Sequence, residues 1–144
     1  MDCKKYTSST LHSGAMRCYT SFCASGETFA TDIPSAIGGR GEYPTPAAML
    51  GASLASCTLS MIAYTAARHD IPAEGISVRA ACSEKAGSIQ SIELNISVPH
   101  FITEDGRKLL EAAARSCPVG RALHPEIEKK NYLALGRLRQ FSVA

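Results

Sequence analysis

The chain has 144 residues, of which 45% are hydrophobic and 19% are charged, and its formal net charge is +2. Such a length and composition suit a single globular domain with a buried core and argue against a disordered protein. The charge is small, the basic residues are scattered and Trp is absent, so we expect no binding of nucleic acid.

The N-terminal segment predicts a small β region. It begins MDCKKYTSSTLHSG, which lacks the apolar core of a signal peptide, so we expect a cytoplasmic protein. Short strands and turns are predicted over about 1–33, with strand patterns at 16–24 and 28–33. Glycine and proline then crowd residues 34–45, which indicates a loop.

A long central helix is predicted over about 46–69. Thr45 is its expected N-cap and Pro46 its first residue, where the missing N–H of proline has no cost. The uncharged run 47–67 is long enough to span a bilayer, but five Ser and Thr residues interrupt it. We therefore expect a helix that is buried on all sides in a protein outside the membrane.

The segment 75–140 predicts a ββαβ arrangement. A strand is expected at 75–84 and a stronger one at 91–98, where apolar and polar residues alternate, so that one face packs on a core and the other lies in water. The apolar set is Ile92, Leu94, Ile96 and Val98, and the polar set is Glu93, Asn95 and Ser97. Thr103 is the expected cap of a helix over 104–115, and 131–138 predicts a last strand. The order of elements indicates a mixed α+β protein.

Two of the six cysteines occupy positions suited to thiol chemistry. Cys57 lies in the middle of the central helix among small residues. Cys117 precedes Pro118, the expected first residue of a short helix, so it can act as an N-cap whose thiolate the helix N–H groups stabilise. Alternatively, Cys117 only fills the kink between two helices, and the local pattern leaves both interpretations open. Two thiols in contact would suit a peroxidase cycle, with one oxidised to a sulfenic acid and the other condensing with it to a disulfide.

The other four cysteines, Cys3, Cys18, Cys23 and Cys82, have no partner motif, and we expect them to be small apolar fillers. No two cysteines have the C-x-x-C spacing of a structural zinc site. A thiol metal site that uses Cys57 and Cys117 would lack a further ligand at metal-binding spacing, so we expect no metal and no cofactor.

Two stretches resemble the OsmC/Ohr family of osmotically inducible and organic hydroperoxide resistance proteins. They are TDIPSAIGGRGEYPTPAAMLGASLASCTLSM and SCPVGRALHP, and the resemblance covers roughly residues 15–140. It implies a single α+β domain of OsmC-like fold, in which antiparallel sheets pack on long central helices and two chains form an intertwined homodimer. It also implies thiol-dependent reduction of organic hydroperoxides, in oxidative or osmotic stress defence, with a dithiol reductant that is lipoyl or thioredoxin-like.

The resemblance also assigns individual residues. Cys57 corresponds to the peroxidatic cysteine, Cys117 to the resolving cysteine, and Arg17 to the arginine that holds the thiolate. Arg40, in the glycine-rich loop, is the competing candidate for the arginine.

One departure from the family concerns a carboxylate. The organic hydroperoxide resistance members have a glutamate early in the central helix, where this chain has Ala47 and Ala48. Glu42 could take its place, but we expect it to lie in solvent. A non-catalytic, stress-related small-ligand-binding protein on the same fold is therefore the alternative interpretation.

Overall fold

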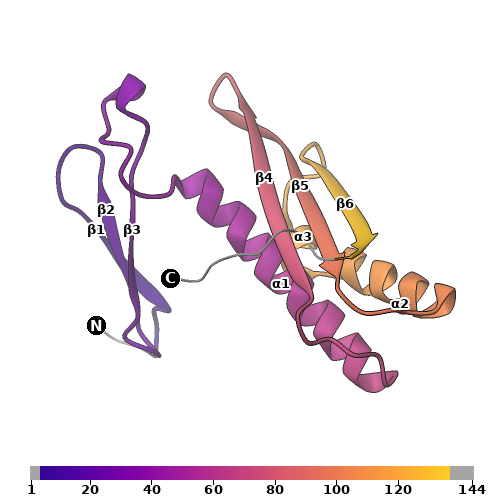
Figure 1. Cartoon of the computed structure of the whole chain (residues 1–144). Helices are drawn as coiled ribbons and strands as arrows, with labels where there is room; N and C mark the ends of the chain where they lie inside the picture. The colour runs from indigo at the N-terminus through magenta and orange to yellow at the C-terminus, as the bar shows by residue number, and fades with distance from the viewer. Residues whose placement is uncertain (1–3, 137–144) are drawn as a thin grey trace. The chain divides into compact units, whose positions relative to one another are not determined.

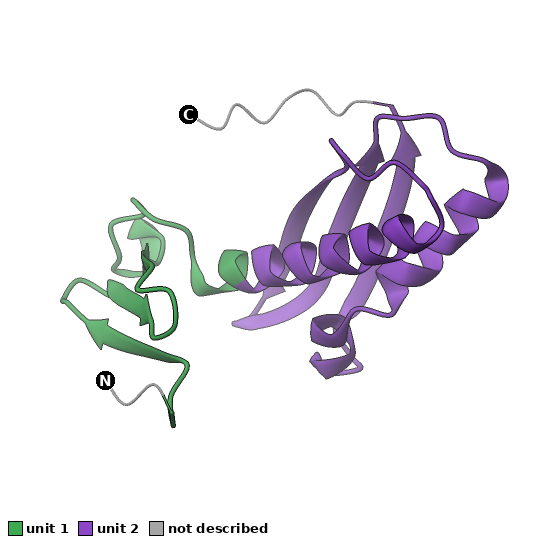
Figure 2. Cartoon of the chain, turned by 90° about the horizontal axis from the view of Figure 1, so that it is seen from below, with its two compact units in different colours: residues 1–49 green, residues 50–144 purple. Residues whose placement is uncertain are grey.

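The computed structural model describes residues 4–136. The chain divides into two compact units, residues 1–49 and 50–144, and the boundary falls in the first turns of the central helix (Figure 2). Each unit is described by itself.

The first unit contains a three-stranded antiparallel sheet of strand order β1-β2-β3. Its strands are β1 (Ser8–His12), β2 (Cys18–Phe22) and β3 (Thr28–Thr31). The strands expected within 16–24 and 28–33 are therefore confirmed. The expected loop contains one turn of 3₁₀ helix, η1 (Ser35–Ile37), before α1 (Pro46–Arg68) begins.

The helix α1 begins where the sequence predicts. The Ala48 N–H donates to Thr45 Oγ1 at 3.1 Å, which confirms Thr45 as the cap of the first turn. The helix ends at Arg68, and Asp70 then takes a left-handed conformation with φ 53° as the chain turns toward Pro72.

The second unit is built on a sheet of order β4-β5-β6 (Figure 1). Its strands are β4 (Ser77–Lys85), β5 (Ser88–Val98) and β6 (Glu128–Leu135). A tight turn joins β4 to β5, with Ala86 and Gly87 both at positive φ, as a two-residue hairpin requires.

The last strand departs from the expected antiparallel arrangement. β6 begins at Glu128, ahead of the predicted start at 131, and it runs parallel to β5. The reason is the crossover between the two strands. The helices α2 (Glu104–Arg115) and α3 (Pro118–Ala122) return the chain to the N-terminal end of β5, and a parallel pair of strands requires such a connection. Thr103 caps α2 by accepting the Gly106 N–H at 3.1 Å, as predicted.

The core of the second unit lies between the sheet and the two long helices. Figures 1 and 2 show α2 and the part of α1 in this unit on the same face of the sheet. The apolar face of β5 is buried there as predicted, and the core residues from the helices are Leu54, Ile62, Ala66, Leu110, Ala113 and Ala114. On the opposite side of β5, Ser97 is buried, contrary to the expectation of a water-facing position, because its hydroxyl donates to the Gly136 carbonyl.

Burial of α1 is confined to one stripe, so the expectation of a helix buried on all sides is wrong for the single chain. The buried positions are Gly51, Leu54, Thr58, Ile62 and Ala66, which recur at the spacing of one helix face. Of the described helices, α1 alone is long and apolar enough to cross a membrane, and only 22% of its most apolar window is buried. The sheet and α2 cover one side of the helix and leave the other side open.

Candidate active site

Helices α1 and α3 bring the two predicted thiols together in the second unit. Leu54, one turn before Cys57 on α1, packs in a cluster with Cys117. Gly120 permits this approach, because a Cβ atom at that position would lie 3.3 Å from Leu54 Cδ1. Cys57 and Cys117 are both free thiols, and Cys57 contacts the same cluster as Cys117. The sequence could not show whether Cys57 and Cys117 lie near each other, and the structure places them in one cluster.

Cys117 is the N-cap of α3, as the sequence pattern suggested. Its side chain is 2% exposed, and its Sγ accepts the Gly120 N–H at 3.5 Å. Burial raises the pKa of the Cys117 thiol, but hydrogen bonds from the Cys57 thiol, the Gly120 N–H and the Thr58 hydroxyl outweigh it and lower that pKa below its usual value. The environment therefore favours a thiolate on Cys117.

Cys57 has the opposite shift. Its hydrogen bond to Cys117 raises the pKa of Cys57, burial raises it further, and the Val119 N–H only partly opposes them. Within the second unit taken by itself, these directions favour a thiolate on Cys117 over one on Cys57. A positive charge near Cys57 would favour its thiolate.

A cavity of about 410 Å³ lies beside the thiol pair. Cys117 forms part of its wall, whereas Cys57 is not among the lining residues. The wall is otherwise made by side chains of α1, α2, α3 and β6, with Leu54, Thr58, Arg115, Arg121, Leu123 and Lys129 among them. The sulfur that a small molecule in this cavity would meet is that of Cys117.

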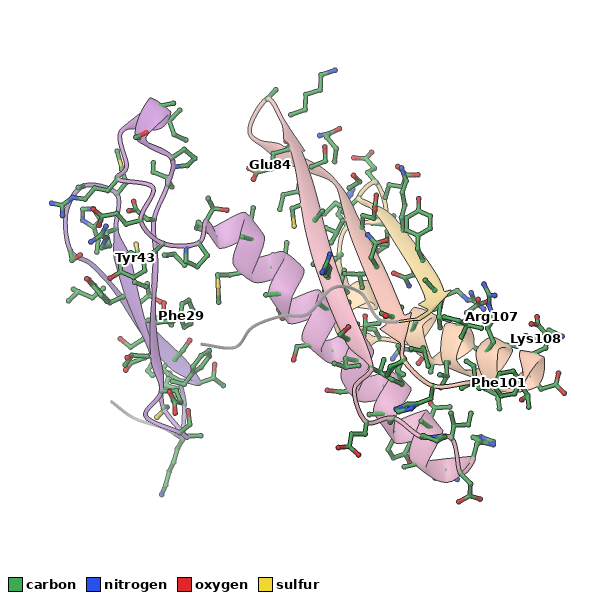
Figure 3. The ribbon with its side chains drawn as sticks, in the orientation of Figure 1. Phe29, Tyr43, Glu84, Phe101, Arg107 and Lys108 are labelled. Atoms are coloured by element: carbon green, nitrogen blue, oxygen red, sulfur yellow. The ribbon has the colours of Figure 1, made fainter. Side chains whose placement is uncertain are left out.

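The first unit contains Arg17, the predicted arginine, in a set of fixed contacts. Arg17 Nη2 donates to Asp32 Oδ2 at 3.0 Å and also to the Glu42 carboxylate. Its guanidinium carbon lies 4.6 Å from the centre of the Tyr43 ring, which Figure 3 labels. The Arg17 side chain is only 11% exposed, so these partners hold it in one place.

Asp32 organises the loop around Arg17, and the sequence reasoning missed it. Its carboxylate is buried and accepts the backbone N–H groups of Ile33, Arg40 and Glu42, at 2.8, 3.2 and 3.3 Å. Burial acts to raise the pKa of Asp32, but Arg17 and these three N–H groups outweigh it and lower that pKa to about 2. The one sequence signal that could have predicted this role is the position of Asp32 near the end of the strand-like segment TFATDI, directly before the loop that it binds.

We expect the stability that Asp32 contributes to disappear in acid. Its folded pKa of about 2 lies below the ordinary value of 3.8, so the contribution is complete above pH 3.8 and is lost as the pH falls through about 2. A carbon-detected NMR titration of the Asp32 carboxyl in the full chain checks this. An Asp32 midpoint near 3.8 would contradict the contacts described.

The two candidate arginines have different surroundings. The Arg40 side chain is exposed and forms no ion pair with any residue in 4–136, and this residue contributes its backbone N–H to Asp32. Glu42 is exposed, as expected, with its side chain 56% exposed, and its carboxylate also pairs with Arg17. The carboxylate that pairs with Arg17 thus comes from Glu42 in the loop. The early positions of α1, where the resemblance would place a glutamate, are Ala47 and Ala48.

The remaining cysteines differ from one another. Cys82, on β4, is a half-buried filler as expected: burial raises its pKa, and it packs on Gly51, where an added Cβ would lie 2.8 Å from its Sγ. Cys18 is a free, half-buried thiol. Cys23 is disulfide-bonded, so the filler interpretation is wrong there, because spacing along a sequence does not show which thiols meet in space. Cys3 lies outside the described residues.

Across residues 4–136 no cluster of three or more His, Cys, Asp or Glu side chains could hold a metal ion.

Known proteins share both sequence and fold with this chain. The OsmC-like protein family model matches residues 39–130. A search of curated proteins gives no match. Among solved structures, a candidate osmotic stress induced and detoxification response protein from Psychrobacter arcticus 273-4 is 26% identical, with a TM-score of 0.82 over 90% of this chain and 96% of that one.

Two further structures are organic hydroperoxide resistance proteins. The OsmC protein from Legionella pneumophila is 19% identical, with a TM-score of 0.70 over 92% of this chain and 98% of that one. The protein from Elizabethkingia anophelis is 21% identical, with a TM-score of 0.72 over 91% and 97%. At these identities the likeness shows a common fold.

Proposed function

This chain belongs to the OsmC-like protein family, and from that premise we propose that it is a cysteine-based peroxidase that reduces organic hydroperoxides to alcohols. The observation that carries the proposal is the pair of free thiols on α1 and α3, which are close enough for the Cys57 thiol to hydrogen-bond to Cys117. Such a pair can form a disulfide without movement of distant parts of the chain.

The proposed cycle uses each thiol once. The Cys57 thiolate attacks the hydroperoxide, so that an S–O bond forms, the O–O bond breaks, and the alkoxide takes a proton and leaves as the alcohol. Cys57 is then a sulfenic acid. The Cys117 thiolate attacks its sulfur, hydroxide leaves as water, and a Cys57–Cys117 disulfide results. The lowered pKa of Cys117 supports the second step, which needs a thiolate as the attacking group.

Arg17 is proposed as the cation that favours the Cys57 thiolate. Asp32 and Glu42 fix its guanidinium, and its buried Nε has no hydrogen-bond partner within residues 4–136, which leaves a donor for a ligand. The hydrogen bonds that Arg17 donates to the Glu42 and Asp32 carboxylates raise the pKa of Arg17 above its usual value, so it stays charged at any working pH.

The open side of α1 supports the proposal of a homodimer. Its exposed positions include the small residues Ala52, Ser53, Ser56 and Ser60, which would let the backbone of a second helix approach closely. A second copy of the chain would remove this weakly polar surface from water. Sedimentation equilibrium tests the proposal, with twice the chain mass of 15.3 kDa as the expected result.

Peroxide-dependent disulfide formation tests the function itself. We expect the reduced protein to consume cumene hydroperoxide with a small dithiol, and to accumulate a Cys57–Cys117 disulfide when the dithiol is omitted. Peptide mass mapping identifies the linked cysteines. If folded, reduced protein neither consumes the hydroperoxide nor forms this disulfide, the chain is not a peroxidase of this kind.

A further inference from the structure

The side chain of Thr58 lies where α1 meets the start of α3. Thr58 is 1% exposed and lies one turn after Leu54 on the buried stripe of α1. Leu54 contacts α3 closely, because a Cβ atom on Gly120 would lie 3.3 Å from Leu54 Cδ1. Residues four apart on a helix share one face, so Thr58 faces the same end of α3, and it lines one cavity together with Cys117.

The Thr58 hydroxyl does not bond to its own helix. Ser and Thr within a helix can donate to the carbonyl four residues earlier, and Ser60 of α1 does so, to the Ser56 carbonyl at 3.0 Å. Thr58 Oγ1 has no nitrogen or oxygen partner within residues 4–136, and its hydrogen bond goes to the sulfur of Cys117. Buried polar groups are nearly always paired, so this sulfur is the group that satisfies the hydroxyl.

The hydrogen bond from Thr58 is available after Cys57 has been oxidised. In the reduced pair, the sulfur of Cys117 accepts from the Cys57 thiol, the Gly120 N–H and the Thr58 hydroxyl. Oxidation of Cys57 to a sulfenic acid removes its S–H group. Thr58 and Gly120 keep their hydrogens, so both can hold the sulfur of Cys117 when it attacks.

We propose that Thr58 is a positioning residue for disulfide formation, because its hydroxyl holds the Cys117 sulfur as a thiolate beside Cys57. The proposal rests on the proposed function. In the step, the Cys117 thiolate gives an electron pair to the sulfur of the Cys57 sulfenic acid, and an S–S bond forms. The S–O bond breaks, and the hydroxide takes a proton and leaves as water. Thr58 keeps its own proton and acts only through Cys117.

The effect of this hydrogen bond on the rate depends on pH. A donor to the thiolate lowers the pKa of Cys117, which raises the fraction of thiolate at neutral pH. The same donor makes the thiolate a weaker nucleophile: for a tenfold gain in its fraction, its rate constant falls about threefold. Such a hydrogen bond therefore speeds disulfide formation about threefold well below the pKa and slows it well above the pKa.

The other groups around Cys117 stay the same when only Thr58 is changed. Cys57 on α1 hydrogen-bonds to Cys117, Cys82 on β4 packs in the same cluster, and β5 contributes apolar side chains there. No Asp or Glu is among the described residues of the cavity wall. Its cations come from α2, α3 and β6 and are Arg115, Arg121 and Lys129. A difference between variants at position 58 therefore reports on the hydroxyl or the methyl group of Thr58.

Alkylation of Cys117 tests the hydrogen bond without any hydroperoxide. Thr58→Val removes the hydroxyl and keeps a branched side chain, and Thr58→Ser is the matched control that keeps the hydroxyl. We expect the pH midpoint of iodoacetamide labelling at Cys117, read by peptide mass mapping, to rise in Thr58→Val and to keep its wild-type value in Thr58→Ser. An unchanged midpoint in Thr58→Val, or an equal rise in both variants, would overturn the proposal.

The disulfide step is measured by competition. After cumene hydroperoxide is added, the Cys57 sulfenic acid reacts with dimedone or with Cys117, and the ratio of the two products does not depend on how fast Cys57 was oxidised. We expect Thr58→Val to raise the ratio of dimedone adduct to disulfide about threefold at about pH 6.5, and to raise it less or not at all at about pH 9.5. Thr58→Ser should match the wild type at both pH values.

A ratio that Thr58→Val raises equally at both pH values would mean that the variant displaces Cys117, and it would overturn the proposed role of the hydroxyl. If hydroperoxide gives neither product in folded, reduced protein, the proposed function fails. The labelling midpoint then still decides whether Thr58 acts on Cys117, so the two failures are distinguishable.

Discussion

Cys57→Ser is expected to abolish peroxide consumption, with a loss of at least about 10³-fold in turnover, because a serine hydroxyl is not ionised near neutral pH and cannot take the oxygen atom. The Cys57–Cys117 disulfide should also be absent. The measurement is cumene hydroperoxide consumption with a dithiol, followed by mass mapping of the same samples.

Two further cysteine variants make this result specific. Cys82→Ser removes another half-buried thiol of the same unit and should leave turnover unchanged within about twofold. Cys117→Ser should still consume the first equivalent of hydroperoxide and then hold a sulfenic acid on Cys57, which a dimedone label detects. A Cys57→Ser protein that keeps turning over would move peroxide attack to another residue, with Cys117, whose pKa is lowered, as the first candidate.

Ile62→Ala is expected to lower the free energy of unfolding by about 2–5 kcal/mol, through lost apolar contact and the cavity left behind. Ile62 is 0% exposed and packs with Ile96, Val98 and Leu110, so β5 and α2 both lose a partner. Urea unfolding at one fixed protein concentration measures the effect and keeps any association constant between variants.

The expected order of costs follows the volume removed. Ile62→Val deletes one methylene and should cost about 0.5–1.5 kcal/mol. Lys108→Gln changes an exposed position on α2 and should stay within about 0.5 kcal/mol. If Ile62→Ala costs no more than Lys108→Gln, α1 does not pack on the sheet as described.

The features that sequence alone predicted well are local ones. Thr45, Thr103 and Cys117 each cap a helix by accepting an N–H three residues ahead, and such a pattern depends only on neighbouring residues. The alternation along β5 fixes its buried face in the same way. Sequence alone also placed Cys57 and Cys117, because each lies on or just before a helix whose start is indicated by a proline, Pro46 for α1 and Pro118 for α3.

The features that sequence missed depend on contacts between distant segments. The parallel direction of β6 follows from the path of α2 and α3, and the burial of Ser97 follows from the chain at Gly136. Asp32 and Glu42 meet Arg17 only after the loop closes on the β1-β2-β3 sheet. Pattern and propensity do not encode such pairings, so the electrostatics around Arg17 could not be predicted from the sequence.

The cap at the start of α3 links oxidation of the thiol pair to order in the chain around it. In the reduced state Cys117 Sγ accepts the Gly120 N–H and closes the first turn of the helix. Once that sulfur is bonded to Cys57 it is a neutral and weaker acceptor, and loss of an N-cap costs a helix about 0.5–2 kcal/mol. We therefore expect the first turn of α3 to be closed less firmly in the oxidised protein than in the reduced one, so that the backbone N–H of Gly120 exchanges faster with solvent after oxidation.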